Sequence, residues 1–139
     1  VPPVQAHSLL ARNPLKRKDR MKHAQLYCDG ASSGNPGESG IGVVLISGDE
    51  THEISEHIGI ATNNVAEYKA LVKGLSKARD LGMEKVDIFL DSELLVRQIN
   101  GIYRVKNENL KKLYDEAVST LRSFKSYDIR HIPRCNYRA

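Results

Sequence analysis

The sequence predicts an α/β domain built on a five-stranded mixed sheet, in which three antiparallel strands are followed by parallel ones. Two observations predict it: three strand-like segments follow one another before the first helical pattern, and the later strands alternate with helices. Short turns join antiparallel strands, whereas a strand that follows a crossover helix pairs in parallel. With 139 residues the chain can form one domain with a real core, but not two.

The antiparallel strands come first. Residues 25–28 read as a strand that ends at Asp29, and a turn rich in Gly, Ser, Asn and Pro then runs to Gly40. Residues 41–47 are almost continuously apolar, and residues 53–59 alternate after a short turn. This spacing predicts a three-stranded meander.

Helical periodicity begins next. In residues 65–78 apolar side chains recur at intervals of three and four, after Thr62 and Asn63 as capping candidates and before Gly82 as a terminator. The remaining elements follow in order: a strand at 86–90, a helix at 92–99 capped by Ser92, a helix at about 108–124 and a strand at 128–132. Helices between the last strands imply parallel pairing.

The charge of the chain is concentrated at one end. Residues 1–25 hold six Lys or Arg and one Asp, so their net charge is +5 and that of the remainder is −1. We expect residues 1–23 to form a flexible basic extension and residues 24–139 the folded domain. Such an extension serves a polyanion or is a solvated flank.

Composition also bears on location. No apolar run approaches the roughly 20 residues that cross a bilayer, and nothing resembles a secretory signal. The two cysteines make neither a disulfide framework nor a zinc cluster, and Cys28 is expected to be a buried thiol. A cytoplasmic, reducing location is therefore expected.

Three carboxylates occupy comparable places: Asp29, Glu67 and Asp91 each lie where an apolar segment meets a turn or a helix. Asp29 and Asp91 close strands that lead to one end of the sheet, and Glu67 lies one turn into the intervening helix. Each acid alone could be a turn residue or a helix cap. Three buried like charges, however, are unfavourable unless a cation offsets them. The expected cation is Mg²⁺ or Mn²⁺, so the pattern indicates metal-dependent phosphoryl transfer.

Two polar segments accompany these acids. The DGASSGNPG loop combines glycines that permit close backbone approach with the amide of Asn35, and the TNNVAE segment places two amides before Glu67. Amides can hydrogen-bond a 2′-hydroxyl, which distinguishes RNA from DNA. Alternatively, the DGASSGNPG loop is an ordinary chain turn and the TNNVAE segment is an ordinary helix cap.

At this point a family resemblance becomes specific. The segments YCDGASSGNPG, GIGVVL, TNNVAEYKAL, IFLDSELLVRQING and HIPR, in this order and spacing, resemble type 1 ribonuclease H of the compact bacterial, archaeal and plant-like branch. The resemblance covers about residues 25–139. It implies a ribonuclease H-like fold and an endoribonuclease that cleaves the RNA strand of RNA–DNA hybrids. Nothing in the sequence indicates a membrane or an obligate protein partner.

The resemblance also implies roles for individual residues. Asp29 would bridge two Mg²⁺ ions, for which Mn²⁺ could substitute, and Glu67 and Asp91 would complete the coordination of one of them, all three as catalytic metal ligands. Substrate contacts fall on Gly30, Asn35, Thr62, Asn63 and Asn64. Of these, the three asparagines and the Gly30 main chain would approach the RNA strand, and Thr62 would hold a phosphate of the DNA strand.

Two departures from the family pattern stand out. The fourth carboxylate, which follows the HIPR strand and opens the last helix, has no counterpart before the sequence stops at Ala139, and neither has a catalytic-loop histidine. His131 precedes that loop and is expected to pack or hydrogen-bond on its strand. We expect a chain truncated at its C-terminus, with impaired activity if the absence is real. The alternatives are a non-catalytic nucleic-acid-binding module of the same fold and a nuclease domain from a larger polypeptide.

Overall fold

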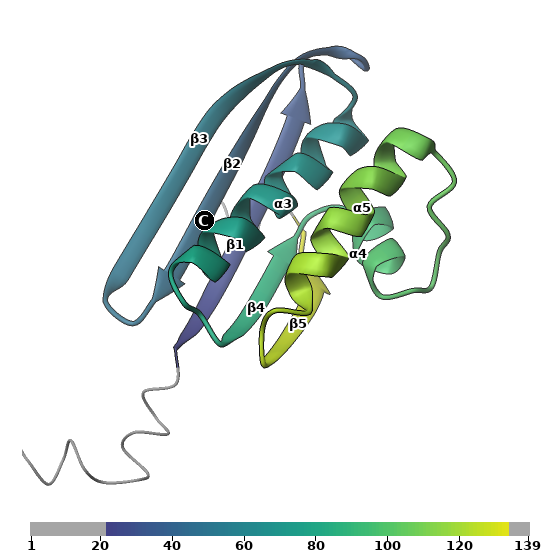
Figure 1. The fold of residues 1–139 in the computed structure, drawn as a ribbon. Coiled ribbons are helices and arrows are strands. Elements are labelled where there is room, and N and C mark those ends of the chain that lie inside the picture. Colours follow the sequence, from purple (N-terminus) through teal and green to yellow (C-terminus); the bar gives the residue numbers. More distant parts are fainter. Residues whose placement is uncertain (1–21, 134–139) are drawn as a thin grey trace, which may run out of the picture.

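The fold is an α/β arrangement around one five-stranded sheet (Figure 1). A computed structural model describes residues 22–133. The elements in chain order are β1 (His23–Ser32), β2 (Gly37–Ser47), β3 (Glu50–Ala61), α3 (Asn63–Asp80), β4 (Lys85–Leu90), α4 (Glu93–Ile99), α5 (Glu108–Leu121) and β5 (Ser126–His131). Residues 1–21 of the extension predicted at residues 1–23, and the last residues, 134–139, lie outside this description. His23, which was assigned to the extension, begins β1.

The sheet has the order β3-β2-β1-β4-β5. Strands β1, β2 and β3 pair antiparallel, whereas β4 pairs in parallel with both β1 and β5. The predicted mixed sheet is therefore confirmed. Its central strand, β1, is the one strand of the five with an antiparallel neighbour on one side and a parallel neighbour on the other.

The end of β1 differs from the prediction. The parallel ladder to β4 stops at Cys28, which faces Leu90, but the antiparallel ladder to β2 continues to Ser32, which faces Ser39. The sequence context of Asp29 predicted that β1 ends there, and this prediction was wrong. Backbone hydrogen bonding to β2 extends β1 through small residues that carry no apolar signal.

Helix boundaries follow their caps. Thr62 is the N-cap of α3, where its side chain accepts a hydrogen bond from the Val65 amide at 3.2 Å, and Ser92 caps α4 in the same way. Both caps were predicted. Helix α5 is shorter than predicted and ends at Leu121; Phe124, which was assigned to it, lies beyond the helix and is still buried. Apolar spacing alone does not separate a last helical turn from a buried residue after it.

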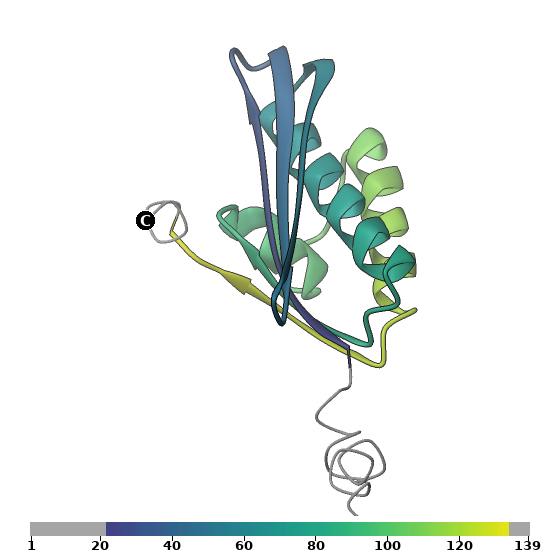
Figure 2. The same cartoon turned by 90° about the vertical axis from the view of Figure 1, so that its left-hand side faces the viewer.

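The core lies between the sheet and α3. Helix α3 packs on β1 and β2, and α5 packs against α3, so both lie on one face of the sheet (Figure 2). Alternate residues of the strands, such as Leu26, Leu45 and Ile88, are fully buried in the core. Each such side chain contributes about 1.5–3 kcal/mol of hydrophobic free energy. No helix within residues 22–133 is both long and apolar enough to cross a membrane.

Close contact between α3 and β1 depends on a glycine in the helix. A Cβ on Gly74 would lie 2.9 Å from Sγ of Cys28 and 3.1 Å from a methyl carbon of Leu26. Cys28 is a free, buried thiol, as predicted, and burial raises its pKa above the ordinary range for a thiol.

On the opposite face of the sheet, Tyr27 and Phe89 stack with ring centroids 4.9 Å apart.

Candidate active site

Two of the predicted acids meet at the end of the parallel ladder. The last paired residues of β1 and β4 are Cys28 and Leu90, and Asp29 and Asp91 are the next residue on each chain. Neighbouring strands lie about 4.8 Å apart. The backbone positions of Asp29 and Asp91 are therefore side by side at the C-terminal ends of two parallel strands, where α/β sheets commonly bind ligands.

Gly30 brings the third acid to the same place. A Cβ on Gly30 would lie 2.2 Å from both C and O of Ala66 and 2.6 Å from the backbone N of Glu67. The main chain of β1 thus touches the first turns of α3, one residue away from Asp29. Only glycine permits this approach. The sequence had indicated Gly30 as a place where nucleic acid comes close, but gave no sign of this internal contact.

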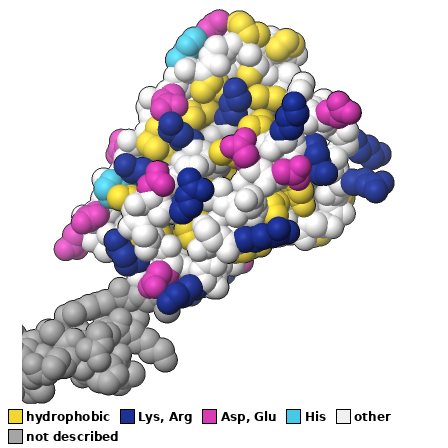
Figure 3. All heavy atoms as spheres, in the orientation of Figure 1, with side chains coloured by type: hydrophobic (Ala, Val, Ile, Leu, Met, Phe, Trp, Pro, Cys, Tyr) yellow, Lys and Arg dark blue, Asp and Glu magenta, His cyan; other side chains and the backbone are white. Residues whose placement is uncertain are grey.

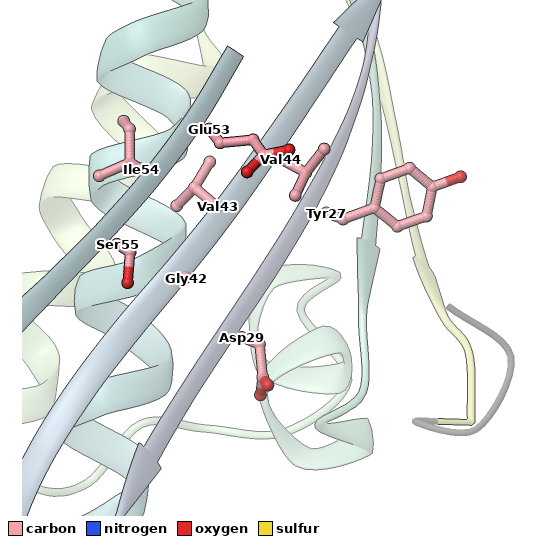
Figure 4. Close-up of a pocket in the computed structure, with 8 residues that line it drawn as sticks. All are labelled: Tyr27, Asp29, Gly42, Val43, Val44, Glu53, Ile54 and Ser55. Carbon is pink, nitrogen blue, oxygen red and sulfur yellow. The ribbon is translucent and has the colours of Figure 1, made fainter. Parts of the chain in front are cut away.

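The side chains of the three acids are partly buried. Asp29 lines an open hollow of about 280 Å³ over β1, β2 and β3, together with residues such as Tyr27 and Val44 (Figure 4). Within residues 22–133, no three His, Cys, Asp or Glu side chains are grouped so that they could hold a metal ion. The β1–β4 register and the contact of Gly30 with α3 bring only the backbone positions of Asp29, Glu67 and Asp91 to the same end of the sheet. Carboxylate oxygens suit a hard divalent cation. Their role as ligands stays a prediction.

The predicted amides are joined to one another across the loop that follows β1. Asn35 accepts a hydrogen bond from the backbone N of Asn63 at 3.1 Å, and the Asn63 side chain accepts one from the backbone N of Ser32 at 2.9 Å. Both amide oxygens are thus engaged within the protein. Because an amide is planar, this fixes the direction of each NH₂ group, which is a donor suited to an external acceptor. Asn64 follows on the exposed start of α3.

The comparison with known proteins places this geometry in a family. A family model described as reverse transcriptase-like matches residues 27–139. LC11-RNase H1, solved in complex with an RNA/DNA hybrid, superposes with a TM-score of 0.75 and is 40% identical, over 84% of this chain and 90% of that chain. The chain belongs to the ribonuclease H family.

Two curated relatives extend this comparison. Ribonuclease HI of Halobacterium salinarum is 40% identical over 124 residues, an alignment that covers 87% of this chain and 62% of the relative. A bifunctional protein of Mycobacterium tuberculosis is 40% identical over 112 residues, which cover 78% of this chain and 31% of the relative. The chain thus spans less than two thirds of the length of each of these curated relatives.

Several contacts that support this ribonuclease H site were missed by sequence reasoning. The hydroxyl of Ser39, which is only 2% exposed, lies 2.8 Å from the Gly37 carbonyl oxygen and 3.1 Å from that of Ala61. The Ser32 hydroxyl lies 3.0 Å from the same Ala61 oxygen. These bonds hold the loop after β1 against the end of β3, directly before α3. Serines in a turn-like segment gave no signal for this role.

Thr62 caps α3 through its side-chain oxygen. This cap uses the oxygen as an acceptor and leaves the hydroxyl proton for donation. The expected contact with a DNA phosphate is compatible with the cap and stays a prediction.

A further acid, two residues after Asp91, forms an ion pair within its own helix. Glu93, in the first turn of α4, accepts two hydrogen bonds from Arg97, at 3.1 and 2.7 Å. The Arg97 hydrogen bonds hold the pKa of Glu93 below its usual range, with smaller contributions from the charges of Arg97 and His131. Glu93 is therefore paired with Arg97 within α4. His131 ends β5 opposite Leu90 and is exposed rather than packed.

Proposed function

We propose that this protein hydrolyses the RNA strand of RNA–DNA hybrids, with divalent metal ions held by Asp29, Glu67 and Asp91. The observation that carries the proposal is the meeting of three acidic positions at one end of the sheet through the β1–β4 register and the contact of Gly30 with α3. The relative LC11-RNase H1, which binds an RNA/DNA hybrid, supports the choice of substrate. Because such hybrids form inside cells, the proposal also places the protein there.

Asp29 is the best candidate for a ligand shared by two ions. Its backbone position neighbours that of Asp91 through the strand register, and that of Glu67 through the contact of Gly30 with α3. Mg²⁺ is the expected ion, with Mn²⁺ as a substitute. When bound, a pair of such ions activates the attacking water and stabilises the leaving oxygen. The chain itself supplies the acidic ligands and holds them at one end of a rigid sheet.

The hybrid would be positioned by neutral donors. The NH₂ groups of Asn35 and Asn63 have directions fixed by their internally bonded oxygens, and they would donate to the RNA strand together with Asn64. Thr62 would donate to a phosphate of the DNA strand. Contacts of this kind position a nucleic acid without reading its bases, so little sequence preference is expected.

The charge distribution suggests that the folded part positions the hybrid and that a different segment attracts it. Residues 22–133 contain 14 Lys or Arg and 16 Asp or Glu, and the face that carries α3 and α5 shows both signs interspersed with apolar side chains (Figure 3). This part of the chain therefore offers little long-range attraction for a polyanion. We propose that the basic segment at residues 16–22 supplies it. Deletion of residues 1–22 should weaken hybrid binding at low salt, and unchanged binding would contradict this role.

The decisive experiment is cleavage of a labelled RNA–DNA hybrid with Mg²⁺ or Mn²⁺. Asp29→Asn should abolish cleavage and leave hybrid binding intact, because it removes the charge that holds the ions and keeps the shape of the side chain. Asp49→Asn, in the exposed turn between β2 and β3, is the matched control and should cleave normally. Retained turnover in Asp29→Asn would overturn the assignment.

A non-catalytic hybrid-binding module is the second candidate. The observation that favours it is that no group of three metal-holding side chains occurs within residues 22–133. The same experiment separates the two functions: hybrid binding without cleavage at any concentration of Mg²⁺ or Mn²⁺ would identify the binding module.

A further inference from the structure

A buried hydrogen bond joins α3 to α4. The hydroxyl of Tyr68 donates to Oε1 of Gln98 at 2.7 Å, and the two residues are only 1% and 7% exposed. The Gln98 oxygen can only accept, so the Tyr68 hydroxyl is the donor of this bond. Buried polar groups of this kind are costly unless they are paired. The bond is therefore a specific feature of the contact between these helices.

The two partners belong to the helices that carry or directly follow two of the predicted metal ligands. Tyr68 directly follows Glu67 in α3. Gln98 is in the second turn of α4, a helix whose cap, Ser92, directly follows Asp91. The hydrogen bond thus connects the helix that carries Glu67 to the helix that begins next to Asp91.

Helix α4 needs such a connection more than α3 does. It has only seven residues, and a helix of this length is not stable on its own. Its other buried residues, Leu95, Val96 and Ile99, make apolar contacts, which are not directional. Gln98 is the one polar residue among those that α4 buries, and its bond to Tyr68 fixes a direction as well as a distance.

We propose that Tyr68 and Gln98 are positioning residues that set the separation of Glu67 and Asp91, and thereby the affinity of the site for divalent metal. This inference rests on the proposed function. Loss of partners that orient metal ligands typically lowers metal affinity or activity about 10- to 100-fold. Neither residue need touch the metal or the hybrid.

The test separates positioning from stability with a double-mutant cycle. Tyr68→Phe leaves Gln98 without its donor, and Gln98→Met leaves the tyrosine hydroxyl without its acceptor, so each single variant should be destabilised. The combined variant replaces both partners with apolar groups of similar size, which commonly restores much of the stability. Thr120→Val is the control, because Thr120 is also buried and bonded, at 2.9 Å to the Glu116 carbonyl, but lies in α5 away from the acids.

Three measurements are made on each variant: the urea midpoint, the Mg²⁺ concentration that half-saturates the amide NMR shifts near Asp29, and kcat and KM for hybrid cleavage. The combined variant should regain a urea midpoint close to that of the unmodified protein. Its half-saturating Mg²⁺ concentration should still be about 10-fold higher. Its kcat should fall with KM little changed, because Asn35 and Asn63 are untouched. Thr120→Val should change only the urea midpoint.

The outcomes are distinct. If the combined variant recovers both stability and Mg²⁺ affinity, or if its Mg²⁺ affinity falls no more than that of Thr120→Val, the bond is purely structural and the inference is wrong. If the unmodified protein neither responds to Mg²⁺ nor cleaves the hybrid, the proposed function itself fails, and the positioning role fails with it.

Discussion

The contact between Gly30 and α3 makes a quantitative prediction for Gly30→Ala. The added methyl group would lie 2.2 Å from backbone atoms of Ala66, whereas ordinary contacts begin at 3.4 Å. Backbone atoms cannot turn aside as side chains do, so β1 and α3 must separate by about 1 Å, a misplacement that can cost about 100-fold in catalysis. Overpacking of this kind costs about 1–3 kcal/mol of folding free energy. Because the clash is with backbone atoms, we expect the cost of Gly30→Ala to lie near the upper end of this range.

The matched control is Gly42→Ala. Gly42 faces Asp29 across the sheet, but an added Cβ there would meet nothing closer than the Asp29 carbonyl oxygen at 4.0 Å. Urea unfolding gives the change in stability, and hybrid cleavage at saturating Mg²⁺ gives the change in rate. We expect Gly30→Ala to lose about 3 kcal/mol and about 100-fold in rate, and Gly42→Ala to lose little of either. Equal stability and rate for the two variants would refute the reasoning.

Three further outcomes are expected. Thr62→Ala should lower the free energy of unfolding by about 1 kcal/mol through loss of the α3 cap, and Thr62→Ser should restore it in urea titrations. Gly74→Ala should cost about 1 kcal/mol, less than Gly30→Ala, because it meets the Cys28 side chain rather than backbone; a larger loss would contradict this comparison. The pKa of Glu84 is lowered, first by its hydrogen bond from Lys125, so its contribution to stability is present above the ordinary pKa of 4.5 and is lost as the pH falls below it. Lys125→Met should therefore make urea midpoints less sensitive to acid, and an unchanged acid dependence would count against the pair.

Much of the architecture could be predicted because it depends on local signals. Apolar periods of two and of three to four residues predicted the strands and helices, and the side chains of Thr62 and Ser92 predicted where α3 and α4 begin. The mixed pairing of the sheet followed from the meander and the crossover helices. Errors occurred where the local signal was weak or misleading, as at the end of β1 and at Phe124.

The candidate site was predicted only in part. Its acids could be named because a strand end and a helix start are both visible along the chain. The bonds that hold the site in shape could not, because they join residues far apart in sequence: Asn35 and Asn63 are separated by 28 positions, and Tyr68 and Gln98 by 30. Nothing local distinguishes such an amide or phenol from a solvated one.

The amino-acid sequence by itself was sufficient to specify the order of strands and helices, the three acidic positions and the family, since each depends on residue type and spacing. The folded arrangement alone decided that Gly30 touches α3, that the amides of Asn35 and Asn63 are oriented by internal bonds, and that Tyr68 holds α4. These are properties of packing: a difference of a few tenths of an ångström in the distance between remote segments determines which contacts exist.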